Sequence, residues 1–190
     1  TLPGTAYENT IGGVTVNLRQ LTINGTLTIP TTSTPRYRNF FGASPGNGGP
    51  ISNIFLANTA SVARTTFFGV NFTGPGAPVT GAEIGDGSGN SGIVFTTPKT
   101  VYLSSTGSPY WGFSPFATTS GGATAAANYP LPQDTVIIAN SSASSGGSIT
   151  AANFAGQIDA SARSNPATIS ALTNVAGNLT LSSSMTISGT

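Results

Sequence analysis

Hydrophobic and polar residues alternate along the first stretch of the chain, residues 11–29. Aliphatic side chains occupy every second position of three short runs, which are Val14–Val16, Leu21–Ile23 and Leu27–Ile29. A period of two is typical of β-strands. The Asn24-Gly25 pair between the second and third runs is a strong turn signal. This segment therefore predicts either a β-hairpin across Asn24-Gly25 or the short strands and corners of a β-solenoid.

A similar rhythm returns in residues 51–74 and again in the C-terminal part of the chain. The C-terminal residues expected to face inward are Ile149, Phe154, Ile158, Ile169, Leu172, Val175, Leu179, Leu181, Met185 and Ile187. Ile149 and Ile169 are separated by about twenty residues, as are Ile158 and Leu179, which is within the range of solenoid repeats. The ending NLTLSSSMTISGT also resembles QLTINGTLTIPTT near the start.

A single coil of this length is not expected to fold alone. Fixing its backbone costs on the order of 20 to 40 kcal/mol, whereas burial of about four or five aliphatic side chains returns only about 10 kcal/mol. Stacked coils close one another's edges, so that only the two ends of the stack need protection. We therefore predict an all-β fold, a right-handed parallel β-helix or closely related β-solenoid. A β-sandwich remains the alternative for the first half, residues 11–95.

The segment 97–138 separates two Thr-rich, strand-forming halves. It begins with a strand pattern at Val101–Leu103 and ends with another at Val136–Ile138. The long loop between them is too irregular for a helix and too aromatic for a disordered linker. We expect an N-terminal solenoid-like segment 1–96, an ordered strand–loop–strand excursion 97–138, and C-terminal solenoid coils 139–190 that continue beyond this sequence.

The low content of charged residues is the most unusual feature of the composition. Only 6% of the residues are charged and the formal net charge is +1, whereas about a quarter of an average globular protein is charged. Nucleic acid is therefore a poor candidate partner, and no apolar run is long enough to insert across a membrane. The chain has no Cys and no His, which removes thiolate metal ligands and the commonest general base. No cofactor is expected.

The acidic residues give little support to an enzyme. They are Glu8, Glu83, Asp86, Asp134 and Asp159. Hydrolysis or elimination on a polysaccharide needs two carboxylates, or a carboxylate with a basic partner, facing one cleft. Glu83 and Asp86 lie in a Gly-rich turn, and Asp134 precedes a strand, where an acid more often binds backbone amides. We therefore expect no enzymatic activity and no catalytic residue.

One weak metal candidate lies in the Gly-rich segment. Asp86, Ser88 and Asn90 occupy alternate positions, as in the first half of a calcium-binding loop. The twelfth position of such a loop is Thr97 rather than a carboxylate. The segment is therefore interpreted as a turn, with calcium as the alternative.

Four aromatic residues of the excursion form the candidate ligand-binding site, which comprises Tyr110, Trp111, Phe113 and Phe116. Exposed rings stack on sugars, so the cluster could be a platform for a glycan. Alternatively, the rings bury one another in a satellite core that anchors the loop to the solenoid. Packing is favoured because Pro109 and Pro115 restrict the loop.

The central segment resembles a module of structural proteins of tailed bacteriophages. The matching features are the T-V-Y strand at Thr100–Tyr102, the loop with Trp111, the Ser-Gly-Gly run at Ser120–Gly122 and the P-x-x-x-D-x-V pattern from Pro130 to Val136. The approach GDGSGNSGIVFTTPKTVY and the closing AGNLTLSSSMTISGT fit the same pattern, so that the resemblance covers residues 81–190.

The resemblance implies a β-helical fibre, spike or other appendage protein of the virion. Such a protein presents the particle to the host surface. Its partners would be two further copies of itself in a homotrimer, other virion proteins and a host cell-surface glycan. A capsid decoration protein, a bacterial β-solenoid adhesin and a polysaccharide-degrading tailspike are the alternatives.

Overall fold

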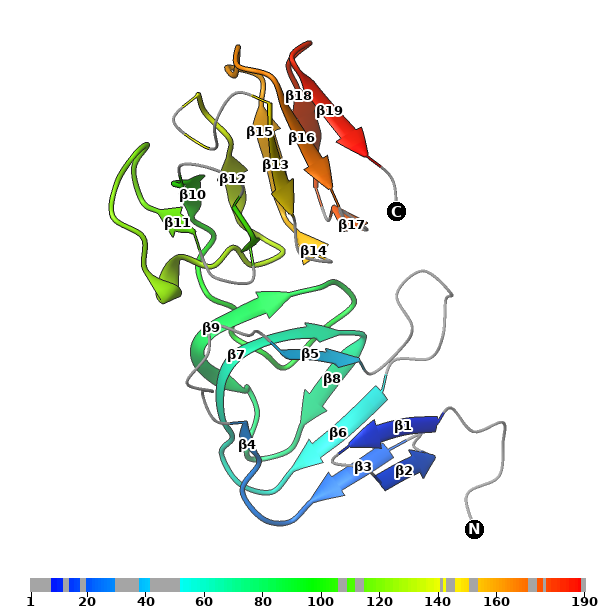
Figure 1. Ribbon diagram of the computed structural model, residues 1–190. Coiled ribbons are helices and arrows are strands. Elements are labelled where there is room, and N and C mark those ends of the chain that lie inside the picture. Colours follow the sequence, from blue (N-terminus) through cyan, green and yellow to red (C-terminus); the bar gives the residue numbers. More distant parts are fainter. Residues whose placement is uncertain are drawn as a thin grey trace. The chain divides into compact units, whose positions relative to one another are not determined.

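The structure of the protein, a computed structural model, describes residues 8–11, 14–17, 20–29, 38–41, 52–105, 109–111, 115–140, 142, 146–150, 154–170, 174–175 and 177–188. The chain forms two compact units, and the boundary after strand β9 lies between Thr96 and Thr97. Every element described is a β-strand apart from the short 3-10 helix η2 (Figure 1). The two units are described separately below.

Strands that are distant in sequence pair in parallel in the first unit. Its described strands are β1 (Glu8–Ile11), β2 (Val14–Asn17), β3 (Gln20–Ile23), β4 (Thr28–Ile29), β5 (Arg38–Phe41), β6 (Ser52–Leu56), β7 (Ser61–Phe68), β8 (Val70–Thr73) and β9 (Thr80–Asp86). β3, β6 and β8 form one sheet, in which Leu21 lies opposite Ile54 and Ile54 opposite Phe72. β7 pairs in parallel with β4, β5 and β9. Parallel strands that recur in register as the chain winds are the coils of a β-solenoid.

The hairpin across Asn24-Gly25 and the β-sandwich alternative for the first half are therefore wrong. β3 and β4, on either side of this pair, do not pair with each other and run parallel to β6 and β7. Leu21 and Ile29 pack on the buried core of the next coil, which buries more apolar surface than an isolated two-stranded hairpin does. Asn24-Gly25 is instead a corner, and the Asn24 carbonyl accepts a hydrogen bond of 2.8 Å from Asn58 Nδ2. Among the described residues of this unit, the antiparallel hairpin joins β1 to β2.

The first unit has a hydrophobic core of its own, supplied by the inward positions of its coils. Its buried members are Ile54, Leu56, Val62, Phe67, Val70, Phe72, Val79 and Ile84. The rings of Phe67 and Phe72 meet edge to face with their centroids 5.5 Å apart, an arrangement that aromatic quadrupoles favour.

The second unit repeats the same architecture with regular coils. Its elements are β10 (Thr100–Leu103), β11 (Phe116–Ala117), η2 (Ala126–Asn128), β12 (Thr135–Ile137), β13 (Gly147–Thr150), β14 (Phe154–Ala155), β15 (Gln157–Ala160), β16 (Ala167–Ser170), β17 (Asn174–Val175), β18 (Leu179–Leu181) and β19 (Met185–Ser188). β10, β12, β15 and β18 pair in parallel in that order, as do β13, β16 and β19 (Figure 1). Ile149 lies opposite Ile169 and Ile158 opposite Leu179. The repeat predicted from these two pairs is confirmed.

The excursion is inserted between two neighbouring coils of the second unit. β10 and β12 pair directly, with Val101 opposite Val136, although a loop of some thirty residues separates them. Within this loop β11 pairs antiparallel with the other edge of β10, where Leu103 lies opposite Phe116. The loop also reaches the second sheet, because Thr150 N donates a hydrogen bond of 3.0 Å to the Pro109 carbonyl. The first coil of this unit is therefore covered by the excursion.

The predicted all-β solenoid is confirmed in both units. Alternation places aliphatic residues inside and Thr, Ser or Asn outside, as in β16, where Ala167 and Ile169 are buried and Thr168 and Ser170 are not. In the part of the chain that the structure describes, no helix is long and apolar enough to cross a membrane.

Candidate functional site

The aromatic residues of the excursion occupy two different environments. Trp111 and Phe116 are completely buried and belong to the main core of the second unit, beside Val101 and Leu103. Their rings meet edge to face with centroids 5.2 Å apart and planes at 83°. Tyr110 is the opposite case, with 48% of its surface exposed.

The burial of Trp111 and Phe116 reduces the number of rings that are accessible for the expected glycan platform. Trp111 and Phe116 cannot stack on a sugar while they fill the core, and they lie in the principal core of the unit rather than in a satellite cluster. Phe113 lies outside the described residues. Of the four predicted rings, Tyr110 is the one that the described structure leaves accessible.

Tyr129, which sequence reasoning did not select, extends the aromatic cluster. Its ring packs edge to face on Phe116, with centroids 6.2 Å apart. Burial, followed by the charge of the neighbouring Tyr110, raises the pKa of the Tyr129 phenol to about 12. The phenol is therefore neutral at any physiological pH, and the side chain acts as packing with one polar end.

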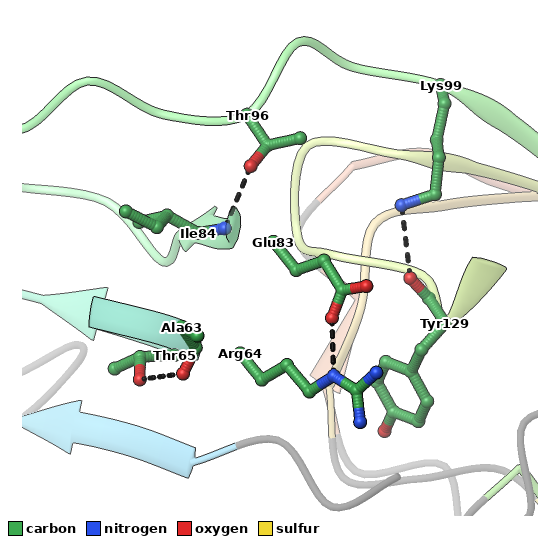
Figure 2. Close-up of polar contacts among 8 residues, drawn as sticks. All are labelled: Ala63, Arg64, Thr65, Glu83, Ile84, Thr96, Lys99 and Tyr129. Atoms are coloured by element: carbon green, nitrogen blue, oxygen red, sulfur yellow. Dashed lines mark hydrogen bonds and ion pairs between the residues drawn. The ribbon is translucent and has the colours of Figure 1, made fainter. Parts of the chain in front are cut away.

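Asp134 closes the base of the excursion. Its buried carboxylate accepts hydrogen bonds from Lys99 N at 2.9 Å and from Leu131 N at 2.8 Å. The Lys99 ammonium lies 2.9 Å from Asp134 Oδ2 and donates to the Tyr129 carbonyl at 3.2 Å, the second of these contacts being drawn in Figure 2. One carboxylate thus joins Lys99, which precedes β10, to Leu131, which lies at the end of the loop between β10 and β12. The prediction that Asp134 binds backbone amides is confirmed.

The calcium candidate is a hydrogen-bonded turn. Asp86 Oδ1 accepts hydrogen bonds from Ser88 N at 3.0 Å and from Asn90 Nδ2 at 2.8 Å. Asn90 Oδ1 accepts one from Val70 N, and Asn90 Nδ2 also donates to the Phe67 carbonyl. Asp86 Oδ1 and Asn90 Oδ1 are therefore engaged with the chain itself. Among the described residues, no three Asp or Glu side chains gather as metal ligands.

An ion pair in the first unit marks the bend of two stacked strands. Arg64 and Glu83 have positive φ angles of 49° and 57°, and the Arg64 Nε lies 2.6 Å from Glu83 Oε2 (Figure 2). The neighbouring residues stay in register, with Thr65 opposite Ile84. Both strands therefore turn a corner at the same place, and the pair joins adjacent coils there. The sequence carried no signal for this pairing, because the two residues are brought together by the register.

Arg163 has a similar structural role in the second unit, and the sequence did not reveal it either. The side chain is buried, and it donates hydrogen bonds to the carbonyls of Asn165 at 2.8 Å, Ala139 at 2.6 Å and Ser142. Burial lowers the pKa of its guanidinium. Because these carbonyls come from corners of successive coils, Arg163 fastens one corner onto the next.

Each described acidic side chain has a partner within the chain. Glu83 is bound to Arg64, Asp86 and Asp134 hold turns, and Asp159 accepts hydrogen bonds from the hydroxyl and backbone amide of Ser161. These hydrogen bonds from Ser161, the side-chain bond first, lower the pKa of Asp159. These contacts stabilise turns or join neighbouring segments of the chain.

Comparison of the chain with protein-family models, with curated proteins and with solved structures finds no significant match.

Proposed function

We propose that this protein is a non-enzymatic structural protein of a tailed-phage virion, forming part of a fibre or spike-type appendage that presents the particle to the host surface. The observation that supports this most is the construction of the coils, in which uncharged outer side chains of neighbouring coils are hydrogen-bonded to one another. Thr168 and Thr186 on neighbouring strands share a hydrogen bond of 2.8 Å between their hydroxyls. In the first unit, Asn71 Nδ2 donates to Asn53 Oδ1 at 2.8 Å in the same manner.

Such ladders suit a protein whose task is mechanical. Each hydroxyl or amide bond between coils adds about 0.5 to 1.5 kcal/mol without a charge that salt could screen. The carboxylates that the structure describes are held by hydrogen bonds or an ion pair within the chain, which favours a structural role over polysaccharide cleavage. The resemblance of residues 81–190 to modules of phage appendage proteins supplies the virion part of the proposal.

Partners follow from the same proposal. We expect a homotrimer, since uncharged Ser- and Thr-rich faces allow identical chains to pack laterally, and attachment to other virion proteins. If a host glycan binds the excursion, Tyr110 is the ring that meets it, because Trp111 and Phe116 are buried.

Immunogold electron microscopy of the source sample tests the location. Antibody raised against this chain should label the tail or projecting fibres, and antibody first absorbed with the pure protein should give no label. Gold spread over the capsid would replace the proposal with a decoration protein. Gold on cells that carry no particles would replace it with an adhesin.

A separate assay tests the absence of catalysis. The protein is incubated with host polysaccharide, and reducing ends and unsaturated sugars are measured. We expect none above a heat-denatured control. Sustained cleavage that is lost in Asp159→Asn, a change on the outer side of strand β15 that leaves the core intact, would identify a tailspike enzyme instead.

A further inference from the structure

The sheet formed by β13, β16 and β19 (Figure 1) has a regular outer face. Inward Ile149 and Ile169 alternate with outward side chains, and parallel pairing in register aligns the outward ones into two columns across the coils. All the outward side chains carry hydroxyls, and none of them is buried. One column comprises Ser148, Thr168 and Thr186, and the other comprises Thr150, Ser170 and Ser188. Neighbouring hydroxyl positions are therefore about 4.8 Å apart across the coils and about 6.6 Å apart along a strand.

Tyr110 continues the second of these columns. It forms a parallel bridge with Thr150, and residues paired in this way point their side chains to the same side of a sheet. A hydrogen bond of 3.0 Å from Thr150 N to the Pro109 carbonyl holds this register. The Tyr110 ring is 48% exposed, whereas the adjacent Trp111 is buried in the core. The outer face therefore begins with an aromatic ring and continues with hydroxyls.

Hydrogen bonds between the hydroxyls hold them in place. Ser148 Oγ and Ser170 Oγ lie 3.2 Å apart, and Thr168 Oγ1 and Thr186 Oγ1 lie 2.8 Å apart. A hydroxyl has one donor and two acceptor lone pairs, so each retains bonding capacity toward a ligand. Because these side chains are already ordered, binding to them costs little side-chain entropy.

The chemistry of this face matches that of a neutral sugar chain. The apolar face of a sugar ring stacks on an exposed aromatic ring, and the sugar hydroxyls exchange hydrogen bonds with Ser and Thr. None of the outward residues of the two columns carries a charge, so the face has no local attraction for an anionic polymer. From Tyr110 to Ser188 the column crosses three strand spacings, about 14 Å, which suits an oligosaccharide rather than a single sugar.

We propose that the outer face of β13, β16 and β19 binds a neutral oligosaccharide, which stacks one sugar on Tyr110 and lays the following sugars along the hydroxyl columns. The inference rests on the proposed contact with a host glycan and deepens it, because it names the site and the class of ligand. The binding surface then belongs mainly to the regular coils of the second unit, and the excursion contributes one ring.

The test is a glycan array that displays neutral and anionic oligosaccharides from bacterial cell surfaces, probed with the pure chain. Isothermal titration calorimetry with the best-bound oligosaccharide then gives the dissociation constant of each variant. We expect neutral oligosaccharides to bind, with an affinity that salt does not change. Tyr110→Ala removes the ring, and Thr168→Lys places a long charged side chain at the centre of the face. Each should weaken binding by more than about tenfold.

Two matched controls separate these effects from a general disturbance of the fold. Tyr110→Phe keeps the ring, and Gln157→Lys adds the same charge to the outer side of the other sheet. Both should bind as the unsubstituted chain does. Circular dichroism and melting of each variant check that it is folded.

Absence of binding, or binding of anionic oligosaccharides that salt abolishes, would overturn the proposal. Binding that neither Tyr110→Ala nor Thr168→Lys weakens would also overturn it, because the sugar would then lie elsewhere. A stable oligomer that Thr168→Lys dissociates would overturn it in favour of copies of the chain that cover this face. The assay uses the pure chain and is therefore independent of the immunogold result. Gold on fibres without oligosaccharide binding would overturn this inference alone, and oligosaccharide binding with gold only on cells would overturn the virion role alone.

Discussion

Replacement of Asp134 by Asn tests whether this carboxylate closes the excursion. The buried carboxylate accepts two backbone N–H bonds and contacts the Lys99 ammonium. Asn has nearly the same shape but keeps one acceptor oxygen, so its amide would face a backbone N–H. A buried bond to a charged acceptor is worth about 1.5 to 3 kcal/mol, and breaking a buried pair costs about 3 to 5 kcal/mol. Lys99 is 26% exposed, so its ammonium can turn to water when the carboxylate is removed. We therefore expect Asp134→Asn to lower the free energy of unfolding by about 3 kcal/mol, the lower end of the cost of breaking a buried pair.

Urea unfolding followed by Trp fluorescence measures this loss in the second unit, since Trp111 is the single Trp of the chain and lies in that unit's core. In a thermal scan, 3 kcal/mol corresponds to a decrease in Tm of about 6 to 12 °C for a protein of this size. Lys99→Gln is the matched control, because it removes the partly exposed charge and leaves both backbone bonds in place. It should cost clearly less than Asp134→Asn, because the buried carboxylate loses its partly exposed counter-charge but keeps both backbone bonds.

Two results would refute this reasoning. If the free energy of unfolding of Asp134→Asn is within about 1 kcal/mol of that of the unsubstituted chain, which is the error of the extrapolation, the carboxylate does not hold the excursion. If Lys99→Gln costs as much as Asp134→Asn, the ion pair rather than the backbone bonds carries the stabilisation.

Four further predictions concern the core, pH and metal. Ile158→Ala should lower the free energy of unfolding in urea by about 2 to 5 kcal/mol because it leaves a cavity in a buried column. Leu179→Ala, in the same column but 37% exposed, should cost clearly less. Equal costs would contradict the assigned burial. The raised pKa of Tyr129 contributes stability below pH 10 that is lost as pH rises toward 12, so Tyr129→Phe should flatten the Tm profile in that window, and an unchanged profile would argue against the buried phenol. Trp111 should emit in the blue and resist acrylamide, since a red, quenchable emission would place it at the surface. Added chelator should leave Tm unchanged, and a fall would restore the calcium interpretation of Asp86.

The β-solenoid could be predicted because the alternation of hydrophobic and polar residues along the sequence repeats with the coils. Ile149 with Ile169 and Ile158 with Leu179 lie opposite each other as their spacing indicated. The first half was more ambiguous, because an Asn-Gly pair serves a hairpin turn and a solenoid corner equally well. The deciding factor is whether the flanking strands have a neighbouring coil to pack against. This is a property of the whole unit and not of the turn.

Residues that act across coils could not be found from the sequence. Arg64 with Glu83 and Arg163 with its carbonyls depend on which corner stacks on which, and this register emerges only when the coils are assembled. The exposure of the rings in the aromatic loop depends on the side of β10 along which β11 returns. Alternation within the loop carries no information about that choice.

The second unit gathers large aromatic residues and an ion pair in the loop at its beginning. Internal coils are stabilised from both sides, so aliphatic residues and hydroxyls suffice for them. An end coil must cover an edge and a core together, and at the beginning of this unit Trp111, Phe116 and β11 do so while Asp134 and Lys99 close the loop.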